Sequence, residues 1–284
     1  MCAQLIMDGK KIAQEIEIKL KERFQNINAK LATILIGRDE ASKIYLRQKK
    51  LACERVGVDY VQYVLSENVR QSEVIRLIRN VQSDGILVQL PLPKHFSLDT
   101  IITAIDPSKD VDCFHPLNLG KLFLGYEKLA PCTPKGILKM LDYYKIKVEG
   151  ENVLIINHSI VVGKPLAVML LNRNATVSIC HKYTKDLTKY TKEADIIITA
   201  TGVPNLIKKD MIKDGCVIVD AGIARVNGKV VGDVNFDDVK DKVYAISPVP
   251  GGVGPLTVAM VLDNLWELIC NVSRRDDFKS KEEI

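Results

Sequence analysis

Apolar positions along the chain follow two spacings, one typical of helices and one typical of buried strands. In residues 10–24, apolar side chains recur every four residues from Ile12 to Phe24, which predicts an amphipathic helix. The same two spacings predict, in order, a strand at 31–37, a helix at 40–56 that ends at Gly57, a strand at 58–65, a helix at 72–81 and a strand at 85–90.

A second alternation begins with a helix at Thr133-Pro134, where Thr133 suits the N-cap and Pro134 the first helical position. Strands are predicted at 153–157, 175–180, 195–200 and 216–221, and a long apolar helix follows Gly254. Strands that alternate with helices indicate right-handed crossovers and largely parallel sheets. We therefore expect an α/β protein with domains at 1–120 and 121–255, a helix at 256–272 that joins the first domain, and a charged, frayed tail at 273–284.

Length and composition are those of a soluble globular protein. The 284 residues suffice for two domains, and 47% hydrophobic with 26% charged residues is an ordinary balance. The N-terminus lacks the apolar segment of a secretory signal, and no apolar run approaches the roughly 18 residues of a membrane span. We expect a cytoplasmic protein without a membrane partner.

Charge and cysteine content exclude further classes. The net charge of +5 is not gathered into a basic stripe, so no nucleic-acid partner is expected, while an anionic small-molecule substrate is compatible. Seven scattered cysteines without a Cys-x-x-Cys pair are typical of reduced thiols. The four histidines show no metal-ligand spacing, so no metal site is predicted.

Four polar residues in the first half could converge above one sheet. Tyr45 and Lys49 are four residues apart and share a helix face. Gln89 lies at the carboxyl end of a strand, and Asp112 lies in a loop after a short helix. A lysine near such groups can orient or activate water, and a pocket carboxylate suits a ligand with adjacent N–H donors. Each residue alone also fits a solvated helix face or a polar strand edge.

The run 247–257, SPVPGGVGPLT, predicts a rigid turn that exposes backbone amides just before a helix, an arrangement that favours anions or electron-rich rings. A plain connecting loop is the alternative. The stretch 153–165, VLIINHSIVVGKP, predicts a strand that leads into a helix, where dinucleotides bind in α/β proteins, although it lacks Gly-x-Gly-x-x-Gly. The next strand ends at His181-Lys182 instead of the acidic residue usual for NAD, which favours a cofactor with an extra phosphate.

Together these motifs resemble the bifunctional methylenetetrahydrofolate dehydrogenase/cyclohydrolase family, from about residue 10 to 271. The motifs occur in this order: Tyr45-x-x-x-Lys49, Val88-Gln-Leu-Pro-Leu92, Lys109-Asp-Val-Asp112, Pro131-Cys-Thr-Pro-Lys-Gly136, Ile160-Val-Val-Gly-Lys-Pro165, and Pro248-Val-Pro-Gly-Gly-Val-Gly-Pro255 followed by Thr257. The ordered set is far more specific than any single motif.

The resemblance implies a folate-binding catalytic α/β domain and a Rossmann-like NADP-binding domain with a cleft between them. It implies NADP-dependent oxidation of 5,10-methylenetetrahydrofolate to the methenyl form, and hydrolysis of that form to 10-formyltetrahydrofolate. These reactions belong to one-carbon metabolism and supply purine biosynthesis. A homodimer is also implied.

Residue roles follow from the same resemblance. Lys49 would be the key group for hydrolysis, Tyr45 would orient the folate, Gln89 would tune Lys49, and Asp112 would hold the pterin edge. Further folate contacts would come from Val88, Leu90, Pro250, Gly251, Gly252, Val253, Gly254 and Thr257. Cofactor contacts would come from Asn157, His158, Ser159, His181, Lys182, Gly222 and Ile223.

Two positions depart from the family pattern. The family has Gly-Arg-Ser where this chain has Asn157-His158-Ser159, so the turn needs a backbone that asparagine can adopt, and asparagine tolerates left-handed backbone better than most residues. The missing arginine removes the clamp on the 2′-phosphate that the resemblance implies. A histidine with its ordinary pKa of about 6.5 is partly charged at neutral pH. We therefore expect a weaker, pH-dependent preference for NADP, with Lys182 supplying charge and NAD as a possible cofactor. Cys113 replaces a common glycine, which would strain the loop if the position needs a positive φ.

Two other functions are compatible with this chain. One is a dehydrogenase that has lost the cyclohydrolase reaction, against which Lys49 and Gln89 argue. The other is a non-catalytic folate- or nucleotide-binding homologue, which the altered cofactor turn leaves open.

Overall fold

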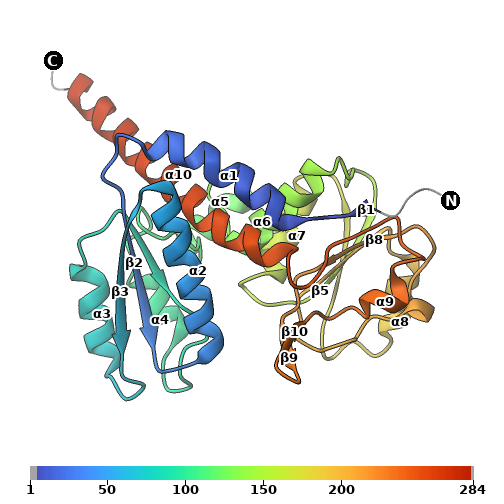
Figure 1. Ribbon diagram of the computed structural model, residues 1–284. Helices are drawn as coiled ribbons and strands as arrows, with labels where there is room; N and C mark the ends of the chain where they lie inside the picture. The colour runs from blue at the N-terminus through green and yellow to red at the C-terminus, as the bar shows by residue number, and fades with distance from the viewer. Residues whose placement is uncertain (1–4, 283–284) are drawn as a thin grey trace. The chain divides into compact units, whose positions relative to one another are not determined.

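The computed structural model describes the backbone of residues 5–282 and the side chains of residues 5–270. The chain forms two compact units, each built around its own parallel sheet (Figure 1). We name them the large-sheet unit, which comprises Met1–Gln14, Leu122–Gly125 and Thr133–Thr257, and the small-sheet unit, which comprises Glu15–Lys121, Tyr126–Cys132 and Val258–Ile284.

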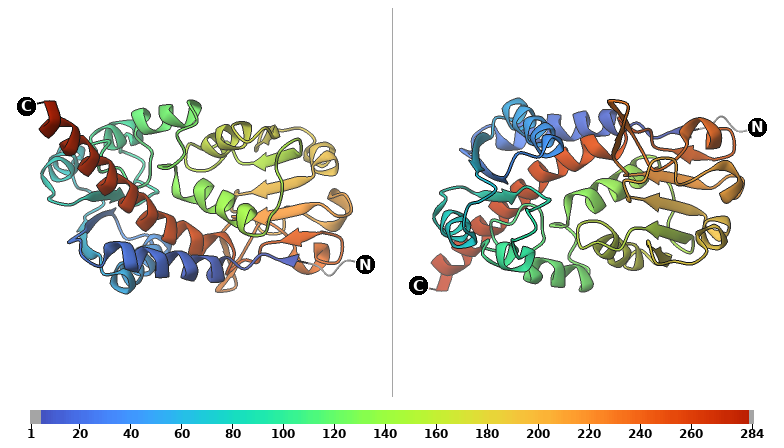
Figure 2. Two further views of the ribbon diagram at one scale, coloured as in Figure 1. Left: turned by 90° about the horizontal axis from the view of Figure 1, so that it is seen from above. Right: turned by 90° about the horizontal axis from the view of Figure 1, so that it is seen from below.

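The large-sheet unit contains a six-stranded sheet in the order β1-β11-β8-β7-β5-β6, with every neighbouring pair parallel. Figure 2 shows its strands side by side. The strands are β1 (Leu5–Ile6), β5 (Asn152–Ile156), β6 (Thr176–Cys180), β7 (Ile196–Thr199), β8 (Val217–Asp220) and β11 (Ala245–Ile246). The remaining elements are α6 (Cys132–Tyr143), α7 (Gly163–Leu171), α8 (Leu187–Glu193), the 3₁₀ turn η1 (Lys209–Met211), the hairpin β9 (Ala224–Val226) and β10 (Lys229–Val231), and α9 (Phe236–Val239).

The strand order of this sheet locates its ligand crevice. From β5 the chain passes to β6 on one side and then to β7 on the other, so the order reverses between β5 and β7. Ligands of open parallel sheets bind outside the carboxyl ends of the strands at such a reversal. The four residues of β7 are all buried, which explains why the sequence shows a continuous apolar run there instead of an alternating one.

The N-terminal residues do not follow the expected domain boundary. We expected residues 1–120 to form the first domain, but β1 pairs with β11 in the six-stranded sheet. Gly9, which follows β1, donates its N–H to the carbonyl of Gly251 at 3.0 Å. A two-residue strand is too short to show a pattern, so its partner is decided by tertiary structure alone.

The small-sheet unit contains three parallel strands in the order β3-β2-β4, and α2 and α3 lie on opposite sides of them (Figure 1). Its buried core between β2, β4, α3 and α4 includes Ile34, Ile78 and Ile101. The elements are α1 (Gly9–Phe24), β2 (Lys30–Ile36), α2 (Glu40–Val56), β3 (Asp59–Leu65), α3 (Gln71–Asn80), β4 (Gly85–Val88), α4 (Leu98–Thr103), α5 (Pro116–Phe123) and α10 (Val253–Glu282). Residues 9–14 of α1 and 253–257 of α10 are grouped with the large-sheet unit.

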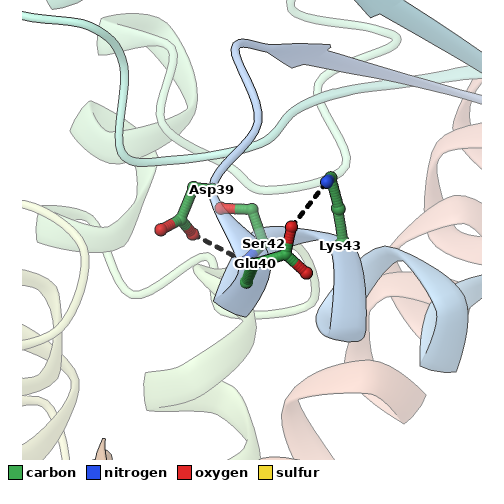
Figure 3. A network of polar contacts seen from close by, with 4 residues as sticks. All are labelled: Asp39, Glu40, Ser42 and Lys43. Atoms are coloured by element: carbon green, nitrogen blue, oxygen red, sulfur yellow. Dashed lines mark hydrogen bonds and ion pairs between the residues drawn. The ribbon is translucent and has the colours of Figure 1, made fainter.

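The start of α2 is fixed by a side-chain cap, shown in Figure 3. Ser42 donates its N–H to the Asp39 carboxylate at 2.7 Å, and Lys43 pairs with Glu40 at 2.6 Å. Hydrogen bonds from the side chain and backbone of Ser42 lower the pKa of Asp39, so the cap is ionised at neutral pH. The helix ends at Gly57, whose φ of 82° is left-handed, as the sequence predicted.

Two helix predictions need correction. Helix α6 begins at Cys132, so Thr133 lies within its first turn and its Oγ1 lies 3.1 Å from Thr257 Oγ1 instead of capping the helix. Helix α10 runs on to Glu282, through most of the segment predicted as a frayed tail, and residues 283–284 of that segment lie outside the described residues.

Helix α10 also corrects the expectation that no segment could span a membrane. By length and composition, Val253–Cys270 would suffice to cross one. Within the structure 56% of this window is buried, and the core helix of a soluble protein meets the same criterion. The long apolar stretch is therefore weak evidence for a membrane span.

Replacing Gly9 with alanine should destabilise the large-sheet unit. A Cβ at Gly9 would lie 1.8 Å from the backbone oxygen of Gly252, and neither backbone can give way cheaply. We expect Gly9→Ala to lower the free energy of unfolding by about 1–3 kcal/mol, measured by urea denaturation. Gly120→Ala is the matched control, because Gly120 lies in α5 with no atom within 4 Å of its added Cβ. Equal stability of Gly9→Ala and the native chain would contradict this packing.

Candidate functional site

In the small-sheet unit, a buried lysine and a glutamine meet as the sequence predicted. Lys49 is only 6% exposed, and its Nζ donates to Gln89 Oε1 at 3.0 Å. Gln89 follows β4 directly, and its Nε2 donates to the Leu90 carbonyl at 2.7 Å, which fixes the direction of the amide. The oxygen of Gln89 is therefore held toward Lys49, and the charge of the ammonium group is satisfied away from bulk water.

Asp112 belongs to the same group of residues. Burial raises the pKa of Asp112, whereas the positive charge of Lys49 and a hydrogen bond with the Cys132 side chain act to lower it. Cys113, the next residue, has a φ of 57° and a fully buried side chain. The position thus does adopt the left-handed conformation that the sequence analysis considered for a glycine, and a cysteine occupies it.

Tyr45 lies one helical turn before Lys49 on α2 and is partly buried, and this burial raises the pKa of its hydroxyl. Val88 is only 7% exposed and packs within the apolar core, so its side chain is mainly structural. Leu90 is partly exposed and, with Asp112, lines a small hollow above β4 and α4. The structure therefore brings Lys49, Gln89 and Asp112 together and places Tyr45 beside them.

The glycine-rich turn lies in the large-sheet unit. Gly251 has a φ of 112°, and its carbonyl accepts the N–H groups of Gly9 and Lys10. Gly252 and Val253 are buried, whereas Pro250 is exposed and Gly254 is partly exposed. The Thr257 hydroxyl is already engaged with Val253 O at 3.3 Å and Thr133 Oγ1 at 3.1 Å. The turn is thus held by the backbone at the start of α1 and by the Thr257 hydroxyl.

Asn157 follows β5 at the reversal of the large sheet, and its side chain organises the turn. Its Oδ1 accepts Ser159 N–H at 2.8 Å, Ser159 Oγ–H at 2.7 Å and Gly163 N–H at 3.0 Å, and its Nδ2 donates to the Ala200 carbonyl at 2.6 Å. Asn157 has no positive φ, so the tolerance of asparagine for left-handed backbone is not used at this position. The side chain instead replaces the missing glycine pattern by capping the start of α7 and tying β5 to β7.

His158 and His181 lie next to each other beyond β5 and β6, with ring centroids 4.7 Å apart. His158 is exposed, and the Nδ1 of His181 accepts the N–H of Tyr183 at 3.3 Å. Lys182 is exposed with its Nζ 4.9 Å from the Tyr183 ring centroid. Three basic side chains thus gather at the strand ends where the ribose end of a dinucleotide lies in such folds.

Two buried acids, one at the end of β8 and one after β10, support the segment at Gly222 and Ile223. Neither acid was predicted from the sequence. Asp220 accepts the N–H groups of Gly222, Asp233 and Val234, while Asp233 accepts Thr199 Oγ1 and Thr201 N–H, each at 2.6 Å. Burial raises the pKa of Asp220 to about 6 despite these donors. A Cβ at Gly222 would lie 2.0 Å from Asp233 Oδ1, so only glycine fits there, and Ile223 beside it is exposed.

Within the described residues, no group of three or more His, Cys, Asp or Glu side chains could hold a metal ion. The polar groups at the two sheets are instead lysine, amide, carboxylate and imidazole groups with partners from the protein. These groups are suited to proton transfer and to the binding of anionic or N–H-rich ligands.

Two family descriptions match the chain. Residues 7–112 match the catalytic domain of tetrahydrofolate dehydrogenase/cyclohydrolase, and residues 131–273 match the NAD(P)-binding domain of the same family. A relative from Methanococcoides burtonii, named bifunctional protein FolD, is 50% identical over 270 residues, which cover 92% of this chain and 94% of that protein. A protein of the same name from Aquifex aeolicus is 51% identical over 271 residues, 92% of this chain and 93% of that protein.

Solved structures agree with these matches. The crystal structure of the bifunctional FolD enzyme from Campylobacter jejuni has a TM-score of 0.91 and 48% identity, and the alignment covers 95% of this chain and 99% of that one. The FolD enzyme of Trypanosoma brucei, solved with NADP cofactor and an inhibitor, has a TM-score of 0.90 and 32% identity, with coverage of 96% and 100%.

Truncation of Asn157 should weaken the cofactor turn. Asn157→Ala removes the acceptor of three hydrogen bonds and one donor, so we expect a loss of about 1–3 kcal/mol in the free energy of unfolding, measured by urea denaturation. Asn157→Asp keeps the acceptor and should recover part of that loss. Full stability of the alanine variant would show that the side chain does not organise the turn.

Proposed function

Because the chain belongs to the tetrahydrofolate dehydrogenase/cyclohydrolase family, we propose that it oxidises 5,10-methylenetetrahydrofolate with NADP and hydrolyses the methenyl product to 10-formyltetrahydrofolate. The observation that carries this proposal is the buried Lys49–Gln89 hydrogen bond beside Asp112. Hydride transfer alone does not require a buried lysine, so the presence of both Lys49 and Gln89 favours an enzyme with both activities.

The oxidation step needs placement more than acid–base chemistry. NADP, when bound, accepts a hydride from the methylene carbon of the folate. The protein contributes a fixed backbone for the dinucleotide. Asn157 holds the turn after β5 by hydrogen bonds, and Asp233 packs against Gly222 so closely that no side chain fits there. The large sheet therefore suits the dinucleotide, with Ser159 and Ile223 as further contacts.

The hydrolysis step is assigned to Lys49. A cationic methenyl group beside the lysine disfavours the ammonium form, and the neutral amine can take a proton from the attacking water. Gln89 accepts from the Lys49 nitrogen and so fixes the direction of its hydrogens and lone pair. Tyr45, one turn earlier, would pack against the folate ring.

Asp112 is assigned to the pterin edge. Its carboxylate can accept two neighbouring N–H groups of the ring, and such charge-assisted pairs are stronger than neutral ones. The lysine charge helps to keep this carboxyl ionised although burial opposes ionisation. Leu90 would add an apolar contact to the folate.

The preferred cofactor is NADP. His158, His181 and Lys182 supply positive charge for a 2′-phosphate in place of the arginine that the family resemblance implies, and NAD would be accepted less well. Two adjacent imidazoles repel each other when both are charged, so we expect them to bind the 2′-phosphate more weakly than an arginine would.

We further propose a cytoplasmic, homodimeric enzyme of one-carbon metabolism that supplies purine biosynthesis and has no nucleic-acid or membrane partner. The seven-residue strand β3 supports the dimer. Among the described residues β3 is hydrogen-bonded to β2 on one side and to no strand on the other, and Val64 on this edge strand is 60% exposed. An exposed strand edge with an apolar side chain suits pairing with a second copy.

Replacement of Lys49 should separate the two activities. We expect Lys49→Met to reduce methenyltetrahydrofolate hydrolysis by about 10²–10⁴-fold while NADP-dependent methenyl formation persists, both followed by absorbance. Lys50→Met is the control, since Lys50 is the exposed neighbour. Unchanged hydrolysis in Lys49→Met would overturn the assignment, and a native chain that forms no methenyl product with NADP or NAD would overturn the dehydrogenase function.

Removal of the His158 side chain should weaken the preference for NADP. We expect His158→Ala to lower the ratio of KM for NAD to KM for NADP, because one of the three basic side chains at these strand ends is lost. An unchanged ratio in a folded His158→Ala would exclude His158 as a phosphate ligand.

A further inference from the structure

A fully buried carboxyl group in the large-sheet unit holds the carboxyl end of β7. Asp233 lies two residues after β10 and is 0% exposed. Its Oδ2 accepts the Thr199 hydroxyl at 2.6 Å and the Thr201 N–H at 2.6 Å. Thr199 is the last residue of β7, and Thr201 lies two residues further on. One oxygen therefore ties both the end of β7 and the segment after it to Asp233.

The other oxygen of Asp233 lies against the backbone after β8. A Cβ at Gly222 would lie 2.0 Å from Asp233 Oδ1, so the carboxyl group fills the space that a side chain at residue 222 would need. Among the described residues this oxygen has no hydrogen-bond partner, although it is buried. A buried acceptor without a donor costs about 1–3 kcal/mol, so stability does not explain its place. Its contact with Gly222 instead sets how closely the segment after β8 approaches the end of β7.

A second buried acid fixes the place of the first. Oδ1 of Asp220, the last residue of β8, accepts the Gly222 N–H at 2.9 Å and the Asp233 N–H at 3.2 Å. Its Oδ2 accepts the Val234 N–H at 2.9 Å, and a Cβ at Gly232 would lie 2.0 Å from this oxygen. The backbone at Gly222 and the backbone at Asp233 thus share one acceptor, which holds the two segments at a fixed separation.

The segments that Asp233 joins lie where the nicotinamide end of a dinucleotide is expected. Strands β7 and β8 are parallel neighbours, with Thr199 opposite Asp220 in the register. The proposed 2′-phosphate site lies beyond β5 and β6, on the side of β7 away from β8. A dinucleotide that spans the carboxyl edge of the sheet from there places its nicotinamide beyond β7 and β8. The spacing that Asp233 sets therefore decides where that ring can lie.

We propose that Asp233 is a positioning residue for the cofactor, and that its carboxyl group places the nicotinamide by fixing the distance between the backbone at Thr201 and the backbone at Gly222. Asp233 is fully buried, so it acts through these two segments and does not touch the cofactor itself. The inference rests on the proposed binding of NADP at the carboxyl edge of the large sheet. Hydride transfer depends on placement, and a displacement of about 1 Å can lower a rate by about 10²-fold.

The two proposed activities provide an internal control. Asp233→Ala should lower kcat/KM for NADP in methenyl formation by about 10²-fold. Hydrolysis of added methenyltetrahydrofolate needs no NADP and is assigned to Lys49 in the small-sheet unit, so its rate should stay the same. Asp233→Asn keeps an oxygen for Thr199 and Thr201 and fills the same space against Gly222, so it should restore most of the lost kcat/KM.

Asp195→Ala is the matched control at the opposite edge of the same sheet. Asp195 directly precedes β7, and its carboxylate accepts the Asn152 N–H at 2.8 Å and pairs with Lys213. Its truncation should leave kcat/KM for NADP unchanged, because it supports the amino end of the strand. An equal loss in Asp195→Ala would overturn the proposal. A fall of hydrolysis and of kcat/KM for NADP by the same factor in Asp233→Ala would do so too, since it would indicate a general defect.

A milder variant provides the test even if Asp233→Ala does not fold. Thr199→Val keeps the shape of the side chain and removes one of the two hydrogen bonds to Asp233 Oδ2. We expect kcat/KM for NADP to fall by about tenfold, as for one lost hydrogen bond, with hydrolysis unchanged. An unchanged kcat/KM for NADP in this variant would contradict the positioning role.

Direct binding tests the spacing without reference to folate. Gly222→Ala places a Cβ against Asp233 Oδ1 and should weaken the binding of NADP, measured by calorimetric titration. In the double variant Gly222→Ala/Asp233→Ala the carboxyl group is gone, so the loss of affinity should be smaller than the sum of the two single losses. Additive losses would show that the two positions act independently and would overturn the proposal.

The outcomes also separate this inference from the proposed function. A native chain that binds NADP but does not oxidise 5,10-methylenetetrahydrofolate would contradict the proposed function, while non-additive binding losses would still support the role of Asp233. Native folate activities together with an unchanged NADP affinity in a folded Asp233→Ala would overturn the positioning role alone.

Discussion

The candidate site of the small-sheet unit depends on one constraint, which is that Lys49 is buried and only 6% exposed to solvent. A buried ammonium without partners would cost several kcal/mol, so the surroundings of Lys49 must satisfy it. Gln89 does so from the end of β4, and the Asp39 cap sets where α2 begins and therefore which residues face that strand end. The Lys49–Gln89 hydrogen bond thus links α2 to the end of β4 at the site itself.

The Lys109–Asp112 loop shows how two neighbouring acids acquire different roles. Asp110 is fully internal and accepts the His115 N–H at 2.8 Å and the Asn118 amide at 3.1 Å, so it holds the loop together. Asp112 is more exposed and has lysine and thiol partners instead. Burial raises the pKa of both carboxyl groups, but only Asp112 is directed toward Lys49. A carboxylate becomes a candidate ligand group when its partners leave part of it accessible.

The cofactor turn reaches a stable conformation by a route other than glycine. Both polar atoms of the Asn157 side chain form hydrogen bonds, with Ser159, Gly163 and Ala200. These bonds link the turn after β5 to the residue that follows β7, at the reversal of the strand order. The neighbouring His158 does not take part in these hydrogen bonds and is exposed. In the proposed cofactor site, a histidine in place of the arginine that the family resemblance implies would therefore change the charge near the 2′-phosphate, while the hydrogen bonds of Asn157 keep the backbone of the turn in place.

The sequence by itself determined the alternation of helices and strands, the two parallel sheets and the identity of the main polar groups, because burial imposes periods and apolar runs that are local. It also indicated that Lys49 and Tyr45 share a face, since a helix period fixes this. Tertiary structure alone decided that β1 joins the large sheet, because a two-residue strand has no pattern. It likewise decided that Asn264 donates to the carbonyls of Val111 and Ala130, since residues 153 and 134 positions apart are brought together by packing that leaves no periodic signal.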